Sequence, residues 1–248
     1  MARERHLLID ISNSFTKIAA AGTEAIGRVT RVPTPDLSAE VVRNFCRRFP
    51  GCTAAVSSVV PAVGERIAPA LPPGSFFLGP ENAGGLPIDY PEPTKIGADR
   101  IANALACVVL HGRPAIVVDF GTAVTFDVIS AKGAYVGGVI APGLGLMADY
   151  LHDRTALLPH IKVAKPARAV GRSTREAMLS GAVNGYRGLV KEILARIRAE
   201  EFRGRRPVVV ATGGDAPLIG EGLPLFDAID PLLTLRGLLL AVVHKHRA

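Results

Sequence analysis

Two segments of this chain follow one pattern: an apolar strand that ends in aspartate, a turn of small polar residues, and a second strand. The first is LLIDISNSFTKIAAA (7–21) and the second is AIVVDFGTAVTFDVIS (115–130). Asp119 lies 109 positions after Asp10 in a chain of 248 residues. A tight turn of small residues brings backbone N–H groups and hydroxyls against phosphate oxygens, while a carboxylate at the strand end can face a metal ion. The repeat therefore predicts two similar halves that close on one nucleotide.

Composition and charge argue for a compact protein and against a nucleic-acid-binding one. Apolar residues form 48% of the chain and aromatic residues only 5%, which predicts a compact fold with an aliphatic core. The formal charge is +7, but the basic residues are scattered. The densest group, Arg203, Arg205 and Arg206, has no interleaved aromatic residues that could stack on bases. We therefore expect no nucleic-acid binding, because an anionic small substrate explains the positive charge more simply.

Cysteines and apolar runs indicate the compartment. Cys46, Cys52 and Cys107 are odd in number and lack CxxC spacing, so we expect reduced thiols rather than disulfides or a zinc site. The first ten residues hold too few apolar positions for a signal peptide. No apolar run reaches membrane-spanning length, since Arg236 interrupts the C-terminal one. The expectation is a cytoplasmic protein without membrane contact.

Strands and helices are expected to alternate, which indicates an α/β fold with mixed sheets. Besides the two repeats, the pattern predicts strands at 28–33, 53–60 and 207–212. It predicts helices at 38–49, 98–110, 146–154 and 232–244, and one long helix or two at 174–201. Ser38 is expected to cap the first helix. The second helix is expected to bury Ile101, Leu105, Val108 and Val109. The proline-rich stretch 69–93 is expected to be a loop.

The residues that could carry chemistry are aspartates at strand ends and at a helix start. The chain has no GxxxxGK[ST], GxGxxG, GxSxG or HExxH motif. Asp10 and Asp119 end apolar strands, where a carboxylate is costly unless a cation balances it. A turn or cap role is the alternative, and the helix dipole alone would favour Asp99 in a first turn. We expect at least one of Asp10 and Asp119 to face a bound cation.

Eight segments occur in the order found in type III pantothenate kinases, and the chain resembles that family over nearly its whole length. They are DISNSFTK (10–17), YPEPTKIGADR (90–100), DFGTAVTFD (119–127), GGVIAPGLGLM (137–147), TALLP (155–159), GRSTREAMLSGAVNG (171–185), ATGGDA (211–216) and PLLTLRGL (231–238). The resemblance implies an α/β, duplicated actin-like (ribonuclease H-like) fold, with two mixed-sheet lobes flanked by helices and a cleft between them. The lobes would span 1–115 and 116–248, and the last helix could pack back on the first lobe.

The resemblance also implies an activity, the ATP-dependent phosphorylation of pantothenate to 4′-phosphopantothenate, which is the first step of coenzyme A biosynthesis. Members of the family are typically homodimers, and the implied cofactors are ATP, Mg²⁺ and a monovalent cation, K⁺ or NH₄⁺. The first ATP phosphate loop would comprise Asp10, Ile11, Ser12, Asn13, Ser14, Phe15, Thr16 and Lys17. In it, Asp10 would hold the magnesium–phosphate group.

Other site residues follow from the same resemblance. Asp119 would bind the monovalent cation, and Thr122 would contact ATP. Gly213 and Gly214 would form the turn near the adenosine. Pantothenate would be bound by Tyr90, Gly97, Ala98, Asp99, Arg100 and Thr174. Asp99 would accept the proton of the substrate hydroxyl, the role of a general base.

One position departs from the family pattern. The first loop of the family reads Asp-x-Gly-Asn-Thr, whereas this chain has Ser12 in place of the glycine and Ser14 in place of the threonine. If the first of these positions requires a positive φ, serine would cost on the order of 1 kcal/mol and weaken ATP binding. Two alternatives stay open: a non-catalytic or regulatory relative with the same fold, and a kinase of this fold that acts on another small hydroxyl compound.

Overall fold

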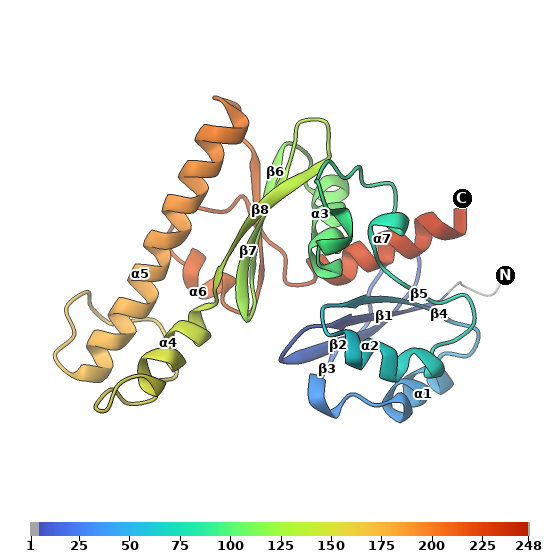
Figure 1. Ribbon diagram of the computed structural model, residues 1–248, viewed down its shortest axis with the longest axis horizontal. Coiled ribbons are helices and arrows are strands. Elements are labelled where there is room, and N and C mark those ends of the chain that lie inside the picture. Colours follow the sequence, from blue (N-terminus) through green and yellow to red (C-terminus); the bar gives the residue numbers. More distant parts are fainter. Residues whose placement is uncertain (1–4, 248) are drawn as a thin grey trace. The chain divides into compact units, whose positions relative to one another are not determined.

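The computed structural model describes residues 5–247, which divide into two compact units. Unit 1 comprises the chain up to His111, residues 133–135 and the segment from Leu232 onward, and unit 2 comprises 112–132 and 136–231. Within the described residues, each unit holds one mixed sheet of five strands with helices packed on it (Figure 1).

Unit 1 is built on a sheet with the strand order β3-β2-β1-β4-β5. β1 pairs antiparallel with β2 and parallel with β4, so the sheet is mixed. Its strands are β1 (His6–Ile11), β2 (Phe15–Ala21), β3 (Thr30–Pro33), β4 (Thr53–Ser58) and β5 (Phe76–Phe77). Its helices are α1 (Ala39–Arg48), α2 (Pro61–Ile67), α3 (Ala98–Leu110) and α7 (Leu233–Arg247), with short 3-10 helices at 34–36, 68–70, 80–82 and 93–95.

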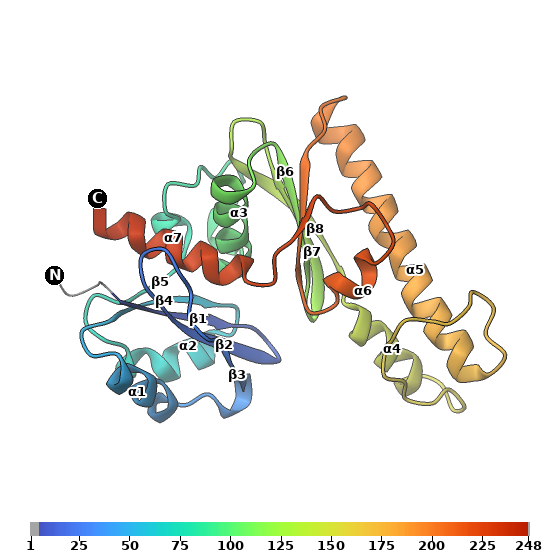
Figure 2. The ribbon, with the colours of Figure 1, turned by 180° about the vertical axis from the view of Figure 1, so that it is seen from behind.

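Different helices cover the two faces of this sheet (Figures 1 and 2). On one face, Leu7, Ile9 and Ile11 of β1 pack with Val42 of α1 and Ile67 of α2 in one apolar cluster. On the other face, α7 packs against β1, β4 and α3. Because both faces are covered, β1 is buried along its whole length, and its sequence is a nearly continuous apolar run rather than an alternating one.

Local signals placed the ends of α1 and α3 well, whereas α2 was not predicted. α1 follows Ser38, whose Oγ accepts a hydrogen bond from Val41 N at 3.3 Å, so the predicted N-cap is confirmed. α3 spans the predicted range 98–110.

The predicted buried face of α3 is partly wrong. Val109 is 56% exposed, whereas the polar Asn103 is fully buried. Asn103 Oδ1 accepts a hydrogen bond from Thr234 Oγ1 of α7 at 2.8 Å. The periodicity of α3 could not reveal this, because α7, which lies more than 120 residues later in the chain, decides which face of α3 is covered.

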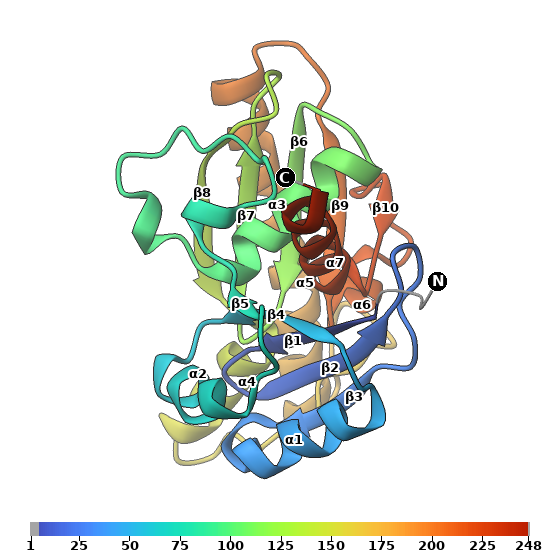
Figure 3. The ribbon, with the colours of Figure 1, turned by 90° about the vertical axis from the view of Figure 1, so that its right-hand side faces the viewer.

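Unit 2 has the strand order β10-β9-β6-β7-β8, in which β6 pairs antiparallel with β7 and parallel with β9 (Figure 3). Its strands are β6 (Ala115–Phe120), β7 (Ala123–Ile129), β8 (Tyr135–Pro142, whose first residue belongs to unit 1), β9 (Val208–Gly213) and β10 (Ala228–Ile229). Its helices are α4 (Leu144–Asp153), α5 (Thr174–Ile197), which a π-helix at 198–202 extends, and α6 (Ala216–Gly220). Val118 and Phe120 of β6 belong to the same apolar cluster as Tyr186 and Val190 of α5.

The two sheets repeat one topology, in which a central strand pairs antiparallel with the next strand and parallel with a later one. Asp10 and Asp119 occupy the same place, the last but one residue of that central strand. The turns differ slightly, because Asp10 lies opposite Lys17 but Asp119 lies opposite Thr125. The predicted α/β class, with two mixed sheets flanked by helices, is confirmed.

Within the described part of the chain, no helix has the length and hydropathy needed to span a bilayer.

Candidate active site

The first predicted phosphate loop connects β1 to β2 in unit 1. Asp10 is 2% exposed, and its Oδ2 lies 3.8 Å from Nζ of Lys17, its registered neighbour on β2. Asn13 and Ser14 in the turn are exposed. The turn can therefore be reached by a ligand, while the carboxylate at its base is buried and partly balanced by an ammonium group.

Thr34 fixes the shape of this turn, a role that the sequence did not predict. Its side chain is almost fully buried, and Oγ1 donates a hydrogen bond to the carbonyl of Ser12 at 2.7 Å. Thr34 Oγ1 also lies 3.1 Å from Oγ1 of Thr16, and its backbone N–H donates to Ser14 O at 3.1 Å. No local signal marks a threonine just after a strand as a support for a turn about twenty residues earlier.

Ser12 does not require a positive φ. In the described part of the chain, Arg203 is the only residue other than glycine with a positive φ. Gly121, at the matching place in the second hairpin, does not have a positive φ either. The condition for backbone strain at Ser12 is therefore not met.

The second predicted phosphate loop connects β6 to β7 in unit 2. Asp119 is half-buried and lies in register with Thr125 of β7 and Thr212 of β9. Registered neighbours point to the same face of a sheet, so one carboxylate and two hydroxyl groups share this face. Oxygen donors of this kind suit a hard cation. Thr122 is exposed in the turn itself.

Two glycines let other loops approach this second turn closely. Gly143 N donates a hydrogen bond to Thr122 O at 3.0 Å, and a Cβ at Gly143 would lie 2.3 Å from that oxygen. Gly213 has a φ of 90°, and a Cβ there would lie 2.4 Å from Phe120 O. Gly214 N donates to the same carbonyl at 3.0 Å. The segments around 143 and 213 therefore line the second turn, and neither glycine can be replaced without moving backbone.

Burial raises the pKa of two ionisable groups next to these loops. The pKa of Asp215 is raised above its usual 3.8 because the carboxyl is buried. Burial, and after it the charge of Asp215, raises the pKa of Tyr186. Tyr186 therefore stays protonated, and its hydroxyl donates a hydrogen bond at 3.1 Å to the carbonyl of Pro142, the residue before Gly143.

The predicted pantothenate-binding run 97–100 forms the start of α3 in unit 1. Gly97 is the N-cap, Ala98 is buried, and Asp99 Oδ1 accepts a hydrogen bond from the backbone of Arg100 at 2.8 Å. A Cβ at Gly97 would lie 2.6 Å from the same carboxylate oxygen. A larger residue there would displace Asp99. The N-terminus of α3 also offers a positive potential to an anion.

Tyr135 connects two predicted substrate contacts in unit 1, a role that the sequence did not predict. Its ring is 1% exposed and packs edge-on against Tyr90, with 6.1 Å between the ring centroids. The guanidinium carbon of Arg100 lies 5.7 Å from the Tyr135 centroid. Backbone hydrogen bonds also hold this strand end, from Asp89 N to Tyr135 O at 2.8 Å and from Tyr135 N to Pro87 O at 2.9 Å. Tyr90 and Arg100 thus both contact the buried ring of Tyr135.

Thr174, the remaining predicted substrate contact, is the first residue of α5 in unit 2 and is exposed. Side-chain hydrogen bonds fix this helix start: the N-cap Ser173 Oγ accepts from Glu176 N at 3.2 Å, and Glu176 Oε2 accepts from Arg172 N at 2.8 Å. A Cβ at Gly171 would lie 2.2 Å from Ala177 N. The segment GRSTREA therefore specifies a sharp helix start that presents Thr174.

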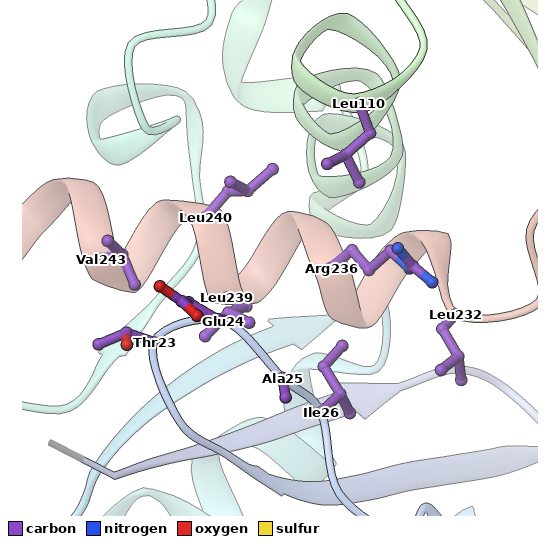
Figure 4. A pocket seen from close by; sticks show the side chains of 10 residues that line it. All are labelled: Thr23, Glu24, Ala25, Ile26, Leu110, Leu232, Arg236, Leu239, Leu240 and Val243. Atoms are coloured by element: carbon purple, nitrogen blue, oxygen red, sulfur yellow. The ribbon is translucent and has the colours of Figure 1, made fainter. Parts of the chain in front are cut away.

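Unit 1 also has a pocket of about 290 Å³ (Figure 4). It is formed by the segment after β2, the end of α3 and one side of α7. The lining residues are Thr23, Glu24, Ala25, Ile26, Leu110, Leu232, Arg236, Leu239, Leu240 and Val243. The ten side chains in Figure 4 include none of the predicted site residues.

The fold is shared with solved structures of low sequence identity. A Baf family protein from Campylobacter jejuni superposes with a TM-score of 0.64 at 21% identity, covering 98% of this chain and 100% of that one. Component A of (R)-2-hydroxyglutaryl-CoA dehydratase from Acidaminococcus fermentans gives 0.53 at 14% identity, covering 98% of each chain. At such identities the likeness concerns the fold alone, and the predicted duplicated actin-like fold is confirmed.

Sequence similarity is more specific. The sequence model of the family described as type III pantothenate kinase matches residues 6–196. A type III pantothenate kinase from Akkermansia muciniphila is 51% identical over 237 residues, covering 95% of this chain and 97% of the relative. Together these matches span the hairpins and the start of α3, and they show that the chain belongs to the type III pantothenate kinase family.

Proposed function

We propose that this protein transfers the γ-phosphoryl group of ATP to the primary hydroxyl of pantothenate, the first step toward coenzyme A. The observation that carries the proposal is the start of α3, where Gly97 leaves room for the Asp99 carboxylate beside Arg100. Asp99 accepts the hydroxyl proton as the oxygen attacks the γ-phosphorus and ADP leaves. Arg100 and the α3 N-terminus suit the carboxylate of pantothenate. Tyr90 and Thr174 are proposed as further substrate contacts.

The two hairpins are proposed to bind the phosphates of ATP. The exposed turn after β1 offers backbone N–H groups and the hydroxyls of Ser12 and Ser14, and Lys17 offers a positive charge. Thr122 is proposed to contact ATP from the second turn. Gly213 and Gly214 are proposed to form the adenosine turn, which is consistent with their close approach to Phe120.

The Asp10 carboxylate is suited to bind a Mg²⁺ ion that the phosphates of ATP also coordinate. Among residues 5–247, no group of three or more His, Cys, Asp or Glu side chains is placed to hold a metal ion. Mg²⁺ is commonly held by one or two carboxylates together with substrate phosphates and water, and Asp10 offers one buried carboxylate at a phosphate loop. Bound Mg²⁺ would neutralise charge on the phosphate oxygens during transfer.

Asp119 is proposed to bind the monovalent cation with the hydroxyl groups that share its face. Replacing K⁺ by Na⁺ in the assay should lower kcat, because the smaller ion fits a site built for K⁺ less well. Asp119→Asn should remove most of this difference. Equal rates of the wild type in the two salts would contradict the role of Asp119.

A direct test is incubation with γ-labelled ATP and pantothenate, followed by detection of labelled phosphopantothenate. Asp99→Asn should lower kcat by about 10²–10⁴-fold, the usual contribution of a general base. Glu40→Gln is the matched control, because Glu40 is an exposed acid in the first turn of α1, and its activity should stay unchanged. No labelled product with the wild type would refute the proposed function, and near-normal turnover of Asp99→Asn would refute only the assignment of the base.

The non-catalytic alternative loses its support at Ser12, whose φ is not positive. A kinase with another substrate would consume labelled ATP with a different hydroxyl compound but not with pantothenate. The same assay therefore separates these possibilities.

We also propose that the protein is a homodimer and works in the cytoplasm, where ATP is supplied. Unit 2 exposes an apolar patch, the α4 patch, which consists of Leu146, Met147, Tyr150 and Leu151 on α4 and Leu157 just after it. Tyr150 is 59% exposed and Leu157 is 91% exposed. Contiguous exposed apolar side chains commonly mark an interaction surface, so we place the dimer contact there.

A further inference from the structure

The hydroxyl of Ser57 is buried in the sheet of unit 1, one strand away from Asp10. In the parallel pairing of β1 and β4, Asp10 and Ser57 are registered neighbours, and Asp10 is likewise registered with Lys17 on β2. Ser57 is 0% exposed and Asp10 is 2% exposed. Neighbouring strands lie about 4.8 Å apart, so a seryl hydroxyl can reach a carboxylate in the same row by rotation of its side chain.

The two side chains point to the same face of the sheet. His6 and Thr53 are also registered neighbours on β1 and β4, and their side chains meet, with His6 Nδ1 3.1 Å from Thr53 Oγ1. Asp10 lies four residues after His6, and Ser57 lies four residues after Thr53. Because side chains alternate between faces along a strand, an even separation returns both to the face on which His6 and Thr53 meet.

The Ser57 hydroxyl has no hydrogen-bond partner among residues 5–247. A buried polar group without a partner is destabilising and uncommon in native proteins, so its presence requires an explanation. The neighbouring Ser58 shows the contrast. Its Oγ donates to Val60 O at 3.2 Å and accepts from Val60 N at 3.3 Å, so it has a local structural role in the turn after β4.

We infer that Ser57 is a positioning residue for Asp10, and that its hydroxyl donates a hydrogen bond to the Asp10 carboxylate when Mg²⁺ and ATP bind at the first hairpin. This inference rests on the proposed function. Without nucleotide, the Lys17 ammonium 3.8 Å away balances the carboxylate. With nucleotide, the phosphates attract Lys17, and Ser57 keeps the carboxylate oriented toward the phosphate loop.

The proposed role of Ser57 affects nucleotide affinity, whereas a serine with only a structural role would affect stability. A hydrogen bond from a hydroxyl to a carboxylate is stronger than one between neutral groups, so Ser57→Ala should weaken nucleotide binding by roughly tenfold or more. The nucleotide-free protein should be no less stable, because the substitution removes a buried hydroxyl that has no partner there.

The experiment is calorimetric titration of Mg²⁺ with the non-hydrolysable analogue AMPPNP into the wild type, Ser57→Ala and the matched control Ser58→Ala. The melting temperature of each protein is measured without ligand. We expect weaker binding with an unchanged or higher melting temperature for Ser57→Ala. Ser58→Ala should bind normally, even if the loss of its turn hydrogen bonds lowers its melting temperature.

A double-mutant cycle tests whether Ser57 acts through Asp10. In kcat/KM for ATP, Ser57→Ala should have little further effect once Asp10→Asn is present. Wild-type affinity in Ser57→Ala, a parallel loss of stability and affinity, or fully additive effects in the cycle would each overturn the inference. If the wild type itself does not bind Mg²⁺ and AMPPNP, the proposed function falls as well, whereas equal binding by wild type and Ser57→Ala removes only the role of Ser57.

Discussion

At the scale of single residues, Asp215 is a position where burial opposes charge. It follows Gly214 and precedes α6, and burial raises its pKa above 3.8. In the unfolded chain the carboxyl has its usual pKa, so the folded state holds the proton more tightly. The stabilising effect of this tighter proton binding is complete below pH 3.8 and is lost as the pH rises through the folded-state pKa.

Asp215→Asn should therefore be at least as stable as the wild type at pH 7, and its advantage should shrink as the pH falls toward 4. Thermal unfolding at pH 4, 5.5 and 7 measures this. Asp227→Asn is the contrasting control, because the Asp227 carboxylate pairs with Arg206 at 2.6 Å and accepts from Val209 N at 2.8 Å. That variant should lose stability at pH 7. A lower melting temperature of Asp215→Asn at pH 7 would contradict the prediction.

At the scale of elements, the first hairpin is a local structure that a distant residue completes. The strand–turn–strand pattern between 7 and 21 predicted the hairpin, and the structure has it as β1 and β2. The turn itself is held by Thr34, which follows β3 and bonds to Ser12 and Ser14. The sequence could not reveal this support, because it depends on the pairing of β2 with β3.

Thr34→Val should raise KM for ATP several-fold with little change in kcat. The substitution keeps the shape of the side chain but leaves Ser12 O without its donor, which costs roughly 1–3 kcal/mol of stability. Steady-state kinetics at saturating pantothenate, together with urea unfolding, measure both effects. Thr30→Val, at the exposed start of β3, is the control and should change neither. An unchanged KM in a folded Thr34→Val protein would show that the turn does not need this support for nucleotide binding.

The helices likewise have features that local sequence predicted and features that depend on distant residues. The Ser38 cap and the limits of α3 were predictable, because capping and periodicity act over a few residues. The burial of Asn103 was not, because its partner Thr234 lies on α7. The exposure of Val109 follows from the same packing.

At the scale of the whole molecule, the internal repeat corresponds to two sheets of one topology, each with an aspartate at the same place in its central strand. The units are not continuous in sequence, because unit 1 also takes in Tyr135 and α7. Tyr135 thereby reaches Tyr90 and Arg100, a contact between residues about 35 or more positions apart.

The proposed homodimer is a property of the whole molecule and can be tested by a substitution in the α4 patch. A charge placed in the α4 patch by Tyr150→Glu should convert the proposed homodimer into a monomer, because a buried unpaired charge at an interface is costly. Sedimentation velocity of the purified protein measures the change. Val109→Glu is the control, because Val109 is an exposed apolar residue of α3 with a similar exposed fraction of 56%. A monomeric wild type would refute the homodimer, and a dimeric Tyr150→Glu protein would refute the α4 patch as the contact.

The sequence by itself determined the family through its ordered motifs, and it determined the duplicated hairpins and the Ser38 cap, because each of these is encoded by residues close together in the chain. Tertiary structure alone decided that Ser57 lies beside Asp10, that Thr34 supports the first turn and that Tyr135 joins Tyr90 to Arg100. The physical reason is that strand register and helix packing bring together residues whose separation along the chain carries no signal of their contact.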